Sequence, residues 1–268
     1  MPLISRPSRK TVLAATTGAA AVAAGAWWFS DRAPYPYSQR RLLDLELPFL
    51  GLSDLDAVLR PRTGERMLEL GPGTGLQALH VAPQLGPDGR LDIVDVQQEM
   101  LDHVMRRAKE EVQAGRNAAA AIVPHCSDAR ELPFDDGVFD AVYLVTALGE
   151  IPEPARMLSA AARVLKPGGR LVVGEFFDRH WIPFGRLHRL ANGQGLHLAE
   201  RRGPSLAYLA RFRPCGRSGL SFGAAPRPPC PPETRRGRSP LPRVIIGFLV
   251  NANLPPLRIP PQDLLRRS

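Results

Sequence analysis

The stretch that decides the fold is Arg66-Met67-Leu68-Glu69-Leu70-Gly71-Pro72-Gly73-Thr74-Gly75. An apolar run that carries an acid near its end passes into three glycines at alternate positions, and a helix-like segment follows at once. Glycine is needed where φ is positive or where a Cβ would collide with a bound molecule. The stretch therefore predicts a buried strand that ends in a turn built for the close approach of a ligand.

Strand-like and helix-like segments alternate outward from this stretch. Strands are expected at 67–70, 91–96, 119–124, 138–145 and 170–176, and helices at 76–85, 99–112, 154–165 and 184–191. Such alternation predicts a parallel sheet covered on both faces. Two further strand candidates, 195–200 and 205–212, are separated by only four residues. Because so short a link cannot join parallel strands, these two should form an antiparallel hairpin at one edge.

The expected fold class is therefore α/β, with a doubly wound, mostly parallel seven-stranded sheet and an antiparallel C-terminal edge hairpin. Ahead of the sheet, apolar residues recur at three- and four-residue spacing between 38 and 59, with an interruption at Pro48. This spacing predicts two short amphipathic helices.

The net charge of +9 is concentrated at the two ends of the chain. Residues 1–33 carry +3 and residues 215–268 carry +7, whereas residues 34–214 carry −1. We therefore place the domain at 34–214, between an Ala-rich hydrophobic leader or membrane anchor and a Pro/Arg-rich tail that is expected to be disordered. The tail's bias is also what a shifted reading frame would produce. Since the tail lacks interleaved aromatic residues, no nucleic-acid partner is expected.

The glycine turn excludes two common nucleotide motifs. The dinucleotide fingerprint needs a glycine three residues after its second glycine, where this chain has Leu76, and the Gly-Lys-Ser/Thr ending of a P-loop is absent. Asp95 closes the second strand about 20 residues beyond the glycines, where a carboxylate can accept both hydrogens of a ribose diol. Its alternative role is a helix cap. After the third strand, Asp128 and Glu131 have capping-box spacing, which is compatible with a ligand contact.

In order and spacing, these motifs resemble class I S-adenosylmethionine-dependent methyltransferases of the type 11 group, which is similar to the ubiquinone/menaquinone C-methyltransferases. The resemblance covers about residues 64–213. It rests on five linked motifs: Glu69 to Gly75, Val94-Asp95-Val96, Asp128-Ala129 with Leu132-Pro133-Phe134, Phe139-Asp140-Ala141-Val142, and Arg163 to Leu171.

The resemblance implies S-adenosylmethionine as the cofactor and a role for each matching residue. Thr146 to Glu150 would lie beside the sulfonium, although this chain lacks the aromatic or histidine residues often found there. Glu69, Gly71, Gly73 and Gly75 would hold the methionine part. Asp95 would hold the ribose, Asp128 and Ala129 would hold the adenine, and Val96 would be a further cofactor-binding residue.

Methyl transfer needs alignment and exclusion of water, and it needs a base only where the acceptor must lose a proton. Glu150 is the first candidate for that base, followed by Asp178 and His180; each also has an ordinary structural alternative. The histidines and cysteines lack metal-ligand spacing, so no metal is assigned.

The predicted activity is methyl transfer to a small, lipophilic acceptor. The alternatives are a non-catalytic or membrane-tethered cofactor-binding scaffold, and a nicotinamide-dependent oxidoreductase, which Leu76 disfavours. Residues 11–29 form an uncharged run long enough to cross a bilayer, and they also fit a signal or transit peptide or a mis-called start. If this run crossed the bilayer, its basic flank would stay inside and the domain would lie outside, where the cofactor is not expected. We therefore expect a cytoplasmic domain with a membrane contact through this run.

Overall fold

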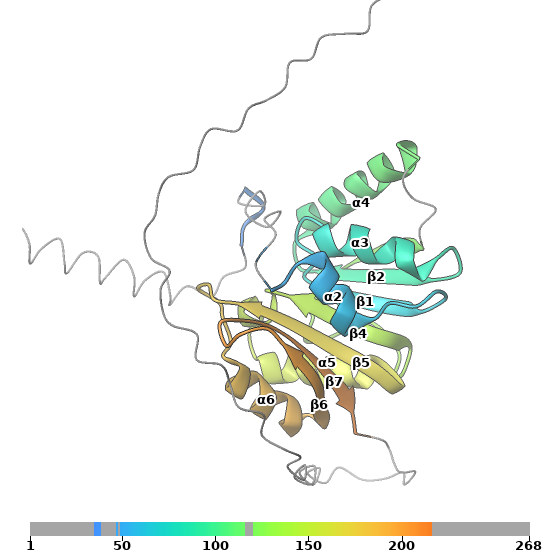
Figure 1. Ribbon diagram of the computed structural model, residues 1–268. Coiled ribbons are helices and arrows are strands. Elements are labelled where there is room, and N and C mark those ends of the chain that lie inside the picture. Colours follow the sequence, from blue (N-terminus) through green and yellow to red (C-terminus); the bar gives the residue numbers. More distant parts are fainter. Residues whose placement is uncertain (1–34, 39–46, 48, 116–119, 216–268) are drawn as a thin grey trace, which may run out of the picture. The chain divides into compact units, whose positions relative to one another are not determined.

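The computed structural model describes residues 35–38, 47, 49–115 and 120–215. A seven-stranded sheet lies at its centre, in the order β3-β2-β1-β4-β5-β7-β6 (Figure 1). Neighbouring strands among β1 to β5 are parallel, while β7 is antiparallel to both β5 and β6. The predicted fold class, edge hairpin included, is confirmed. The strands are β1 (Arg66–Leu70), β2 (Arg90–Asp95), β3 (Ala121–Cys126), β4 (Phe139–Val145), β5 (Leu165–Phe176), β6 (Leu196–Arg202) and β7 (Ala207–Pro214).

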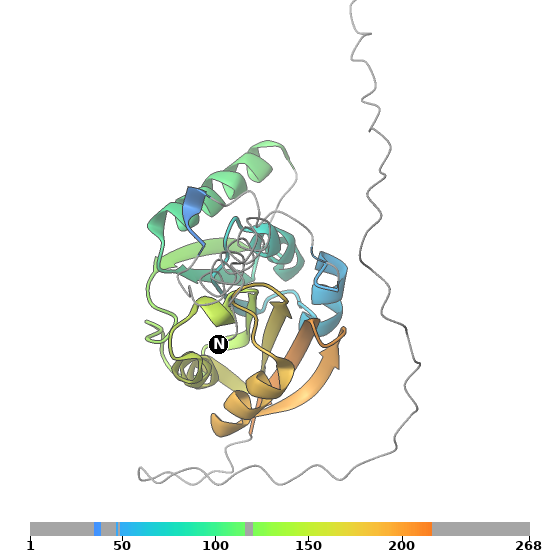
Figure 2. The same cartoon turned by 90° about the vertical axis from the view of Figure 1, so that its left-hand side faces the viewer.

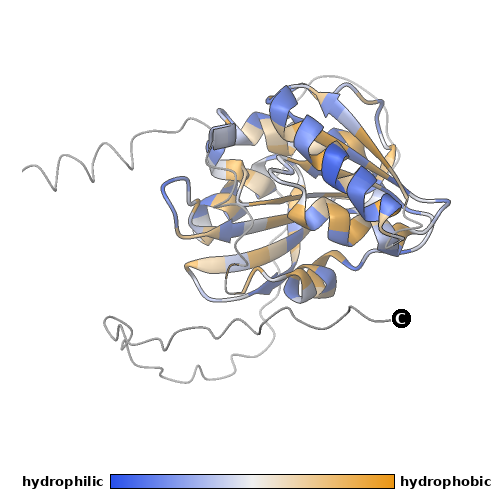
Figure 3. Cartoon of the chain, turned by 90° about the horizontal axis from the view of Figure 1, so that it is seen from above, coloured by the Kyte–Doolittle hydropathy of each residue, from blue (hydrophilic) through white to orange (hydrophobic). Residues whose placement is uncertain are grey.

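Helices cover both faces of the sheet. On one face lie α2 (Leu52–Leu59), α3 (Leu76–Leu85) and α4 (Gln98–Gln113), and on the other α5 (Pro154–Val164) and α6 (Phe184–Gly193) (Figures 1 and 2). Each helix group encloses its own cluster of buried apolar side chains. Within β1, Leu68 and Leu70 belong to the α5 side and Met67 to the α3 side. Burial on both faces explains why the central strands β1, β2, β4 and β5 read as largely apolar runs, orange in Figure 3.

Element boundaries follow the sequence pattern closely, with one clear exception. Helix α3 has the predicted bounds. Strand β5 begins at Leu165, five residues earlier than expected, because Leu165 already pairs with Phe139 before the register shifts and resumes at Arg170. The apolar pattern could not show this, because Lys166 to Gly169 carries no strand period.

Several predictions fall on residues that the structure does not describe. The predicted leader, residues 1–33 with the run 11–29, lies outside the described residues, and so does the predicted tail at 215–268 except for Cys215. Of the two helices expected between 38 and 59, α2 is described, and residues 39–46 and 48 are not. Within the described ranges, no helix has the length and apolar character needed to cross a membrane.

Two buried arginines hold the end of α2 against the sheet. Arg170 on β5 donates to the carbonyl oxygens of Leu59 and Arg60, and Arg211 on β7 donates to that of Val58 at 3.1 Å. Arg170 also forms a two-pronged ion pair with Glu65, at 2.8 and 2.7 Å. Because the last carbonyls of a helix lack partners within it and carry partial negative charge, these guanidiniums satisfy and stabilise the end of α2.

The strand order reverses between β1 and β4, so the turns that follow these two strands face each other across the switch point. Gly71, Gly73 and Gly75 all have positive φ, at 66°, 53° and 85°. A Cβ on Gly71 would lie 2.8 Å from the Cβ of Ala147, which follows β4. A Cβ on Gly75 would lie 2.9 Å from Val104 Cγ1 on α4. Glycine therefore serves packing at both positions, as well as backbone conformation.

The packing role of Gly75 can be measured with a matched control. Gly64 also has positive φ, at 81°, but a Cβ there would meet nothing within 4 Å. Gly64→Ala should cost about 1 kcal/mol of unfolding free energy from backbone strain alone, and Gly75→Ala about 2–4 kcal/mol because the contact with Val104 adds to that strain. Urea unfolding of both variants checks this, and equal losses would contradict it.

Candidate active site

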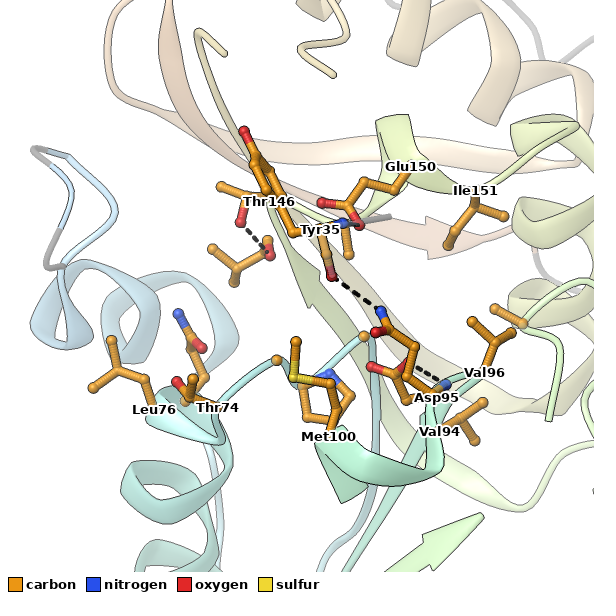
Figure 4. Close-up of a pocket in the computed structure, with 18 of the residues that line it drawn as sticks. Tyr35, Thr74, Leu76, Val94, Asp95, Val96, Met100, Thr146, Glu150 and Ile151 are labelled. Atoms are coloured by element: carbon orange, nitrogen blue, oxygen red, sulfur yellow. Dashed lines mark hydrogen bonds between the residues drawn. The ribbon is translucent and has the colours of Figure 1, made fainter. Parts of the chain in front are cut away.

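A cavity of about 320 Å³ opens at the carboxyl ends of the five parallel strands (Figure 4). Its wall is formed by the turns after β1, β2, β3 and β4, by the end of β5 and by the start of α2. Eight of the ten predicted site residues line it: Gly71, Gly73, Asp95, Val96, Asp128, Ala129, Thr146 and Glu150. The structure therefore brings these residues together, while their individual roles stay predictions.

Glu69 and Gly75 do not line the cavity. Glu69 shares the α3 side of β1 with Met67, is 2% exposed, and accepts a 3.0 Å hydrogen bond from the Tyr143 hydroxyl. Burial raises the pKa of Glu69 to about 8. Gly75 precedes α3 and packs on Val104. Both residues support the turn from behind, and the predicted contact of Glu69 with the methionine part remains a prediction.

Asp95 lines the cavity and also bonds the backbone ahead of α4. Its Oδ1 accepts the N–H of Gln97 at 2.9 Å, in the turn before α4. This backbone contact is compatible with a contact between the Asp95 carboxylate and a ligand. Burial, with a smaller contribution from the charge of Glu150, raises the pKa of Asp95 to about 6. Hydrogen bonds from Gln97 and Val96 oppose the rise. A carboxyl group with this pKa is mostly ionised at neutral pH and becomes protonated when the pH falls below about 6.

The capping box predicted at Asp128 is wrong. No helix begins there, and Asp128 Oδ1 instead accepts the N–H of Arg130 within a turn, at 2.8 Å. The Arg130 side chain donates to both Asp128 oxygens at 2.6–3.0 Å, and the same guanidinium pairs with Glu153. Glu131 pairs with Arg156. The hydrogen bonds from the Arg130 side chain lower the pKa of Asp128 and hold its carboxylate in place.

The segment after β4 contains small residues for reasons of packing. Thr146 has a left-handed backbone, with φ 55°, which is unfavourable for a non-glycine residue and is stabilised here by hydrogen bonds to β5 and Val145. Ala147 faces Gly71, where a larger side chain would collide. A Cβ on Gly149 would fall 1.6 Å from the carbonyl oxygen of His180. Packing therefore excludes any side chain at Gly149.

Tyr35 is the cavity residue that the sequence did not reveal. Its N–H donates to Glu150 Oε2 at 3.2 Å, and its carbonyl accepts from Gln97 Nε2 at 3.1 Å (Figure 4). Its ring contacts His180 edge-on at 5.2 Å and lies under the Arg179 guanidinium at 4.6 Å. The main chain of Tyr35 thus bridges the turns after β2 and β4, and no local pattern around Pro34 and Pro36 signals this.

The cavity is acidic. Four carboxyl groups line it, those of Asp95, Asp128, Glu150 and Asp178, and no arginine, lysine or histidine of the described residues does. Nor do three His, Cys, Asp or Glu side chains gather anywhere in the described ranges in a way that could hold a metal ion. An acidic wall without cations favours a positively charged ligand over a pyrophosphate.

Comparisons with known proteins agree with this geometry. The structure of a S-adenosylmethionine-dependent methyltransferase from Aquifex aeolicus matches with a TM-score of 0.56 and 19% sequence identity, covering 67% of this chain and 98% of that one. The fold is therefore that of class I S-adenosylmethionine-dependent methyltransferases. Residues 68–173 match the family profile described as "methyltransferase domain".

Curated relatives are similar over the same domain. A ubiquinone/menaquinone biosynthesis C-methyltransferase from a Ruegeria species is 32% identical over 56% of this chain and 56% of its own length. A demethylmenaquinone methyltransferase from Beutenbergia cavernae is 38% identical over 50% of each chain. The chain thus spans about half the length of these relatives.

The raised pKa of Asp95 predicts a pH dependence of donor binding. In its predicted role the ionised Asp95 carboxylate accepts the ribose hydroxyls, so donor binding should be full at about pH 7.5 and weaken below the pKa of about 6, by roughly tenfold per pH unit at lower pH. Equilibrium dialysis with S-adenosylhomocysteine between about pH 5 and pH 8 measures this. Asp95→Asn should bind weakly with no inflection near pH 6, and an unchanged inflection would assign it to another group.

Proposed function

We propose that this protein is a methyltransferase that transfers a methyl group from S-adenosylmethionine to a small, lipophilic acceptor. The observation that carries the proposal is the cavity at the switch point, which combines a glycine turn with four carboxyl groups, that of Asp95 among them, and has no cation among its described lining residues. The donor carries a sulfonium and an ammonium group, so its charge complements this wall. A nicotinamide dinucleotide carries a pyrophosphate, which the same wall would repel.

The residues present fit the donor in three respects. The turn at Gly71 and Gly73 offers backbone without side chains, Asp95 offers a carboxylate for the ribose, and Asp128 is fixed by Arg130 with its carboxylate at the cavity wall. Val96, next to Asp95 in the chain, is 55% exposed although apolar, and it also lines the cavity. An exposed apolar side chain in that position suits a flat base.

The donor supplies an activated methyl group, and the chain's own residues align the acceptor and exclude water. Tyr35 covers the cavity through its two main-chain hydrogen bonds. Glu150 Oε2 is bonded to Tyr35 and Oε1 lies 3.5 Å from His180 Nδ1, so this carboxylate is held at the cavity wall on both sides. Where the acceptor nucleophile carries a proton, Glu150 takes that proton as the new bond to the methyl carbon forms.

The lipophilic nature of the acceptor is supported by the walls near Glu150 and by the relatives. Ile151, Pro152 and Phe176 line the cavity beside Glu150. The two relatives described above are named for quinone methylation. These observations favour an acceptor with an apolar body.

Direct binding distinguishes the proposal from its rivals. Equilibrium dialysis of the full chain should show saturable binding of S-adenosylmethionine and none of NAD, because of the acidic wall. Binding of NAD alone would establish the oxidoreductase alternative. Incubation with methyl-labelled donor and fractionated cell extract should then yield a labelled small molecule, whereas donor binding without any labelled product would favour the scaffold.

The role of Glu150 can be separated from donor binding. Glu150→Gln keeps the side-chain shape and an oxygen to accept the Tyr35 N–H, so it should bind S-adenosylhomocysteine like the unaltered protein. Formation of the labelled product should fall by about 10²-fold or more, the usual contribution of a general base. Glu131→Gln, at an exposed acid outside the cavity, is the control, and equal rates in both variants would remove Glu150 from the mechanism.

A further inference from the structure

A second cavity, of about 290 Å³, adjoins the donor cavity on the side of β5 and α6. Ile151 and Asp178 line both cavities, so the two are neighbours along one wall. The partition between them is formed by the short η2 turn (Leu148–Glu150), which packs on the loop after β5 so closely that Gly149 meets the carbonyl oxygen of His180. Glu150, the candidate base, lines the first cavity, while its chain neighbours Gly149 and Ile151 line the second.

The second cavity contains buried polar atoms that lack hydrogen-bond partners. His180 lines it and is 5% exposed, and neither of its ring nitrogens makes a hydrogen bond within the described residues. Its Nδ1 lies 3.5 Å from Glu150 Oε1 without hydrogen-bond geometry. The indole Nε1 of Trp181, another lining residue, is also buried without a partner. Because unmade hydrogen bonds of buried groups cost free energy, such atoms indicate a missing acceptor.

The electrostatic character of the second cavity is opposite to that of the first. Arg179 and Arg186 line it together with His180, and Asp178 is its single lining acid among the described residues. Glu175 lies behind the loop and accepts the N–H of Ile182, and burial raises its pKa to about 8, so it adds little negative charge at neutral pH. The Arg186 guanidinium and the ring N–H groups of His180 and Trp181 therefore lie around a cavity with one lining carboxylate, whereas the Arg179 guanidinium stacks on the Tyr35 ring.

The remaining walls of the second cavity are aromatic and aliphatic. The rings of Phe177 and Trp181 meet edge-on at 5.2 Å, and Phe177 is 48% exposed. Leu148, Ile151 and Ile182 complete the apolar surface. A volume of about 290 Å³ accommodates one small ring system, at the lower end of the range for small-molecule pockets.

We propose that this second cavity binds the acidic end of the methyl acceptor, and that the acceptor is a small aromatic carboxylic acid. The carboxylate is held by Arg186 and the N–H groups of His180 and Trp181, and the ring lies against Phe177. The nucleophilic end then passes Ile151 and Glu150 into the donor cavity. This inference rests on the proposed function and narrows its acceptor from a lipophilic molecule to one with both an apolar ring and a negative charge.

The test uses 4-fluorobenzoate as the probe and 4-fluorobenzamide as its uncharged match. The full chain has three tryptophans, two of them in the leader at 27 and 28, so Trp27→Phe with Trp28→Phe leaves Trp181 as the fluorescent reporter. Fluorobenzoate should change Trp181 emission saturably, and ¹⁹F NMR should give the same dissociation constant. The benzamide should bind at least about fivefold more weakly, because it cannot form charge-assisted hydrogen bonds.

Two exposed arginines on α6 provide the matched variants. Arg186 lines the cavity, whereas Arg189, one turn further along the same helix, does not. Arg186→Ala should weaken benzoate binding about fivefold to tenfold, Arg186→Lys less, and Arg189→Ala not at all. His180→Leu should weaken it as well, and His180→Gln, which keeps an N–H donor, should restore part of the loss. Equal losses in Arg186→Ala and Arg189→Ala, equal binding of benzoate and benzamide, or displacement of the probe by equimolar inorganic phosphate would overturn the proposal.

Binding of the benzoate probe can be measured independently of donor binding. S-Adenosylhomocysteine, which occupies the first cavity, should bind Arg186→Ala and the unaltered protein equally and should leave benzoate bound. Donor binding without probe binding would reject the second site and leave the proposed function intact. Probe binding at Trp181 without any donor binding would support the anion site while rejecting the methyltransferase that it was assigned to serve.

Discussion

The site depends on one close contact, between the turn that follows β1 and the turn that follows β4. The two turns lie on either side of the point where strand order reverses, and at Gly71 they come so close that even a methyl group would collide with Ala147. This contact requires a residue without a side chain at position 71, so backbone lines the cavity there. The acids at the ends of the neighbouring strands line the same cavity, because parallel strands end at a common edge.

Much of this arrangement could be predicted because it follows from local patterns in the amino-acid sequence. Apolar periodicity located the strands and helices, and the spacing of glycines excluded a dinucleotide turn. The positions of Asp95 and Asp128 follow from being the last residues of strands or next to them, so eight of the ten predicted residues reach one cavity. In a parallel sheet, residues at the carboxyl ends of successive strands lie close together. Locating the strand ends in the sequence was therefore enough to predict which residues meet.

The remaining features depend on contacts between distant segments, and no local pattern reports them. Glu69 has the sequence position of a ligand residue, yet the alternation of side chains along β1 directs it toward Tyr143 on a neighbouring strand. Asp128 has capping-box spacing, but Arg130 takes its oxygens and no helix starts. The second cavity requires the loop after β5 to pack on the η2 turn, so its histidine and tryptophan have meaning only in the folded chain.

The bridge made by Tyr35 has a consequence for how such a protein diversifies. Both of its hydrogen bonds, to Glu150 and to Gln97, use main-chain atoms. These two hydrogen bonds therefore do not depend on which side chain stands at position 35. Proline is the exception, because it lacks the N–H. The Tyr35 ring, which contacts His180 and Arg179, can thus be exchanged during evolution without loss of the two main-chain hydrogen bonds, so the side chains around the cavity can change while the turns after β2 and β4 stay bridged.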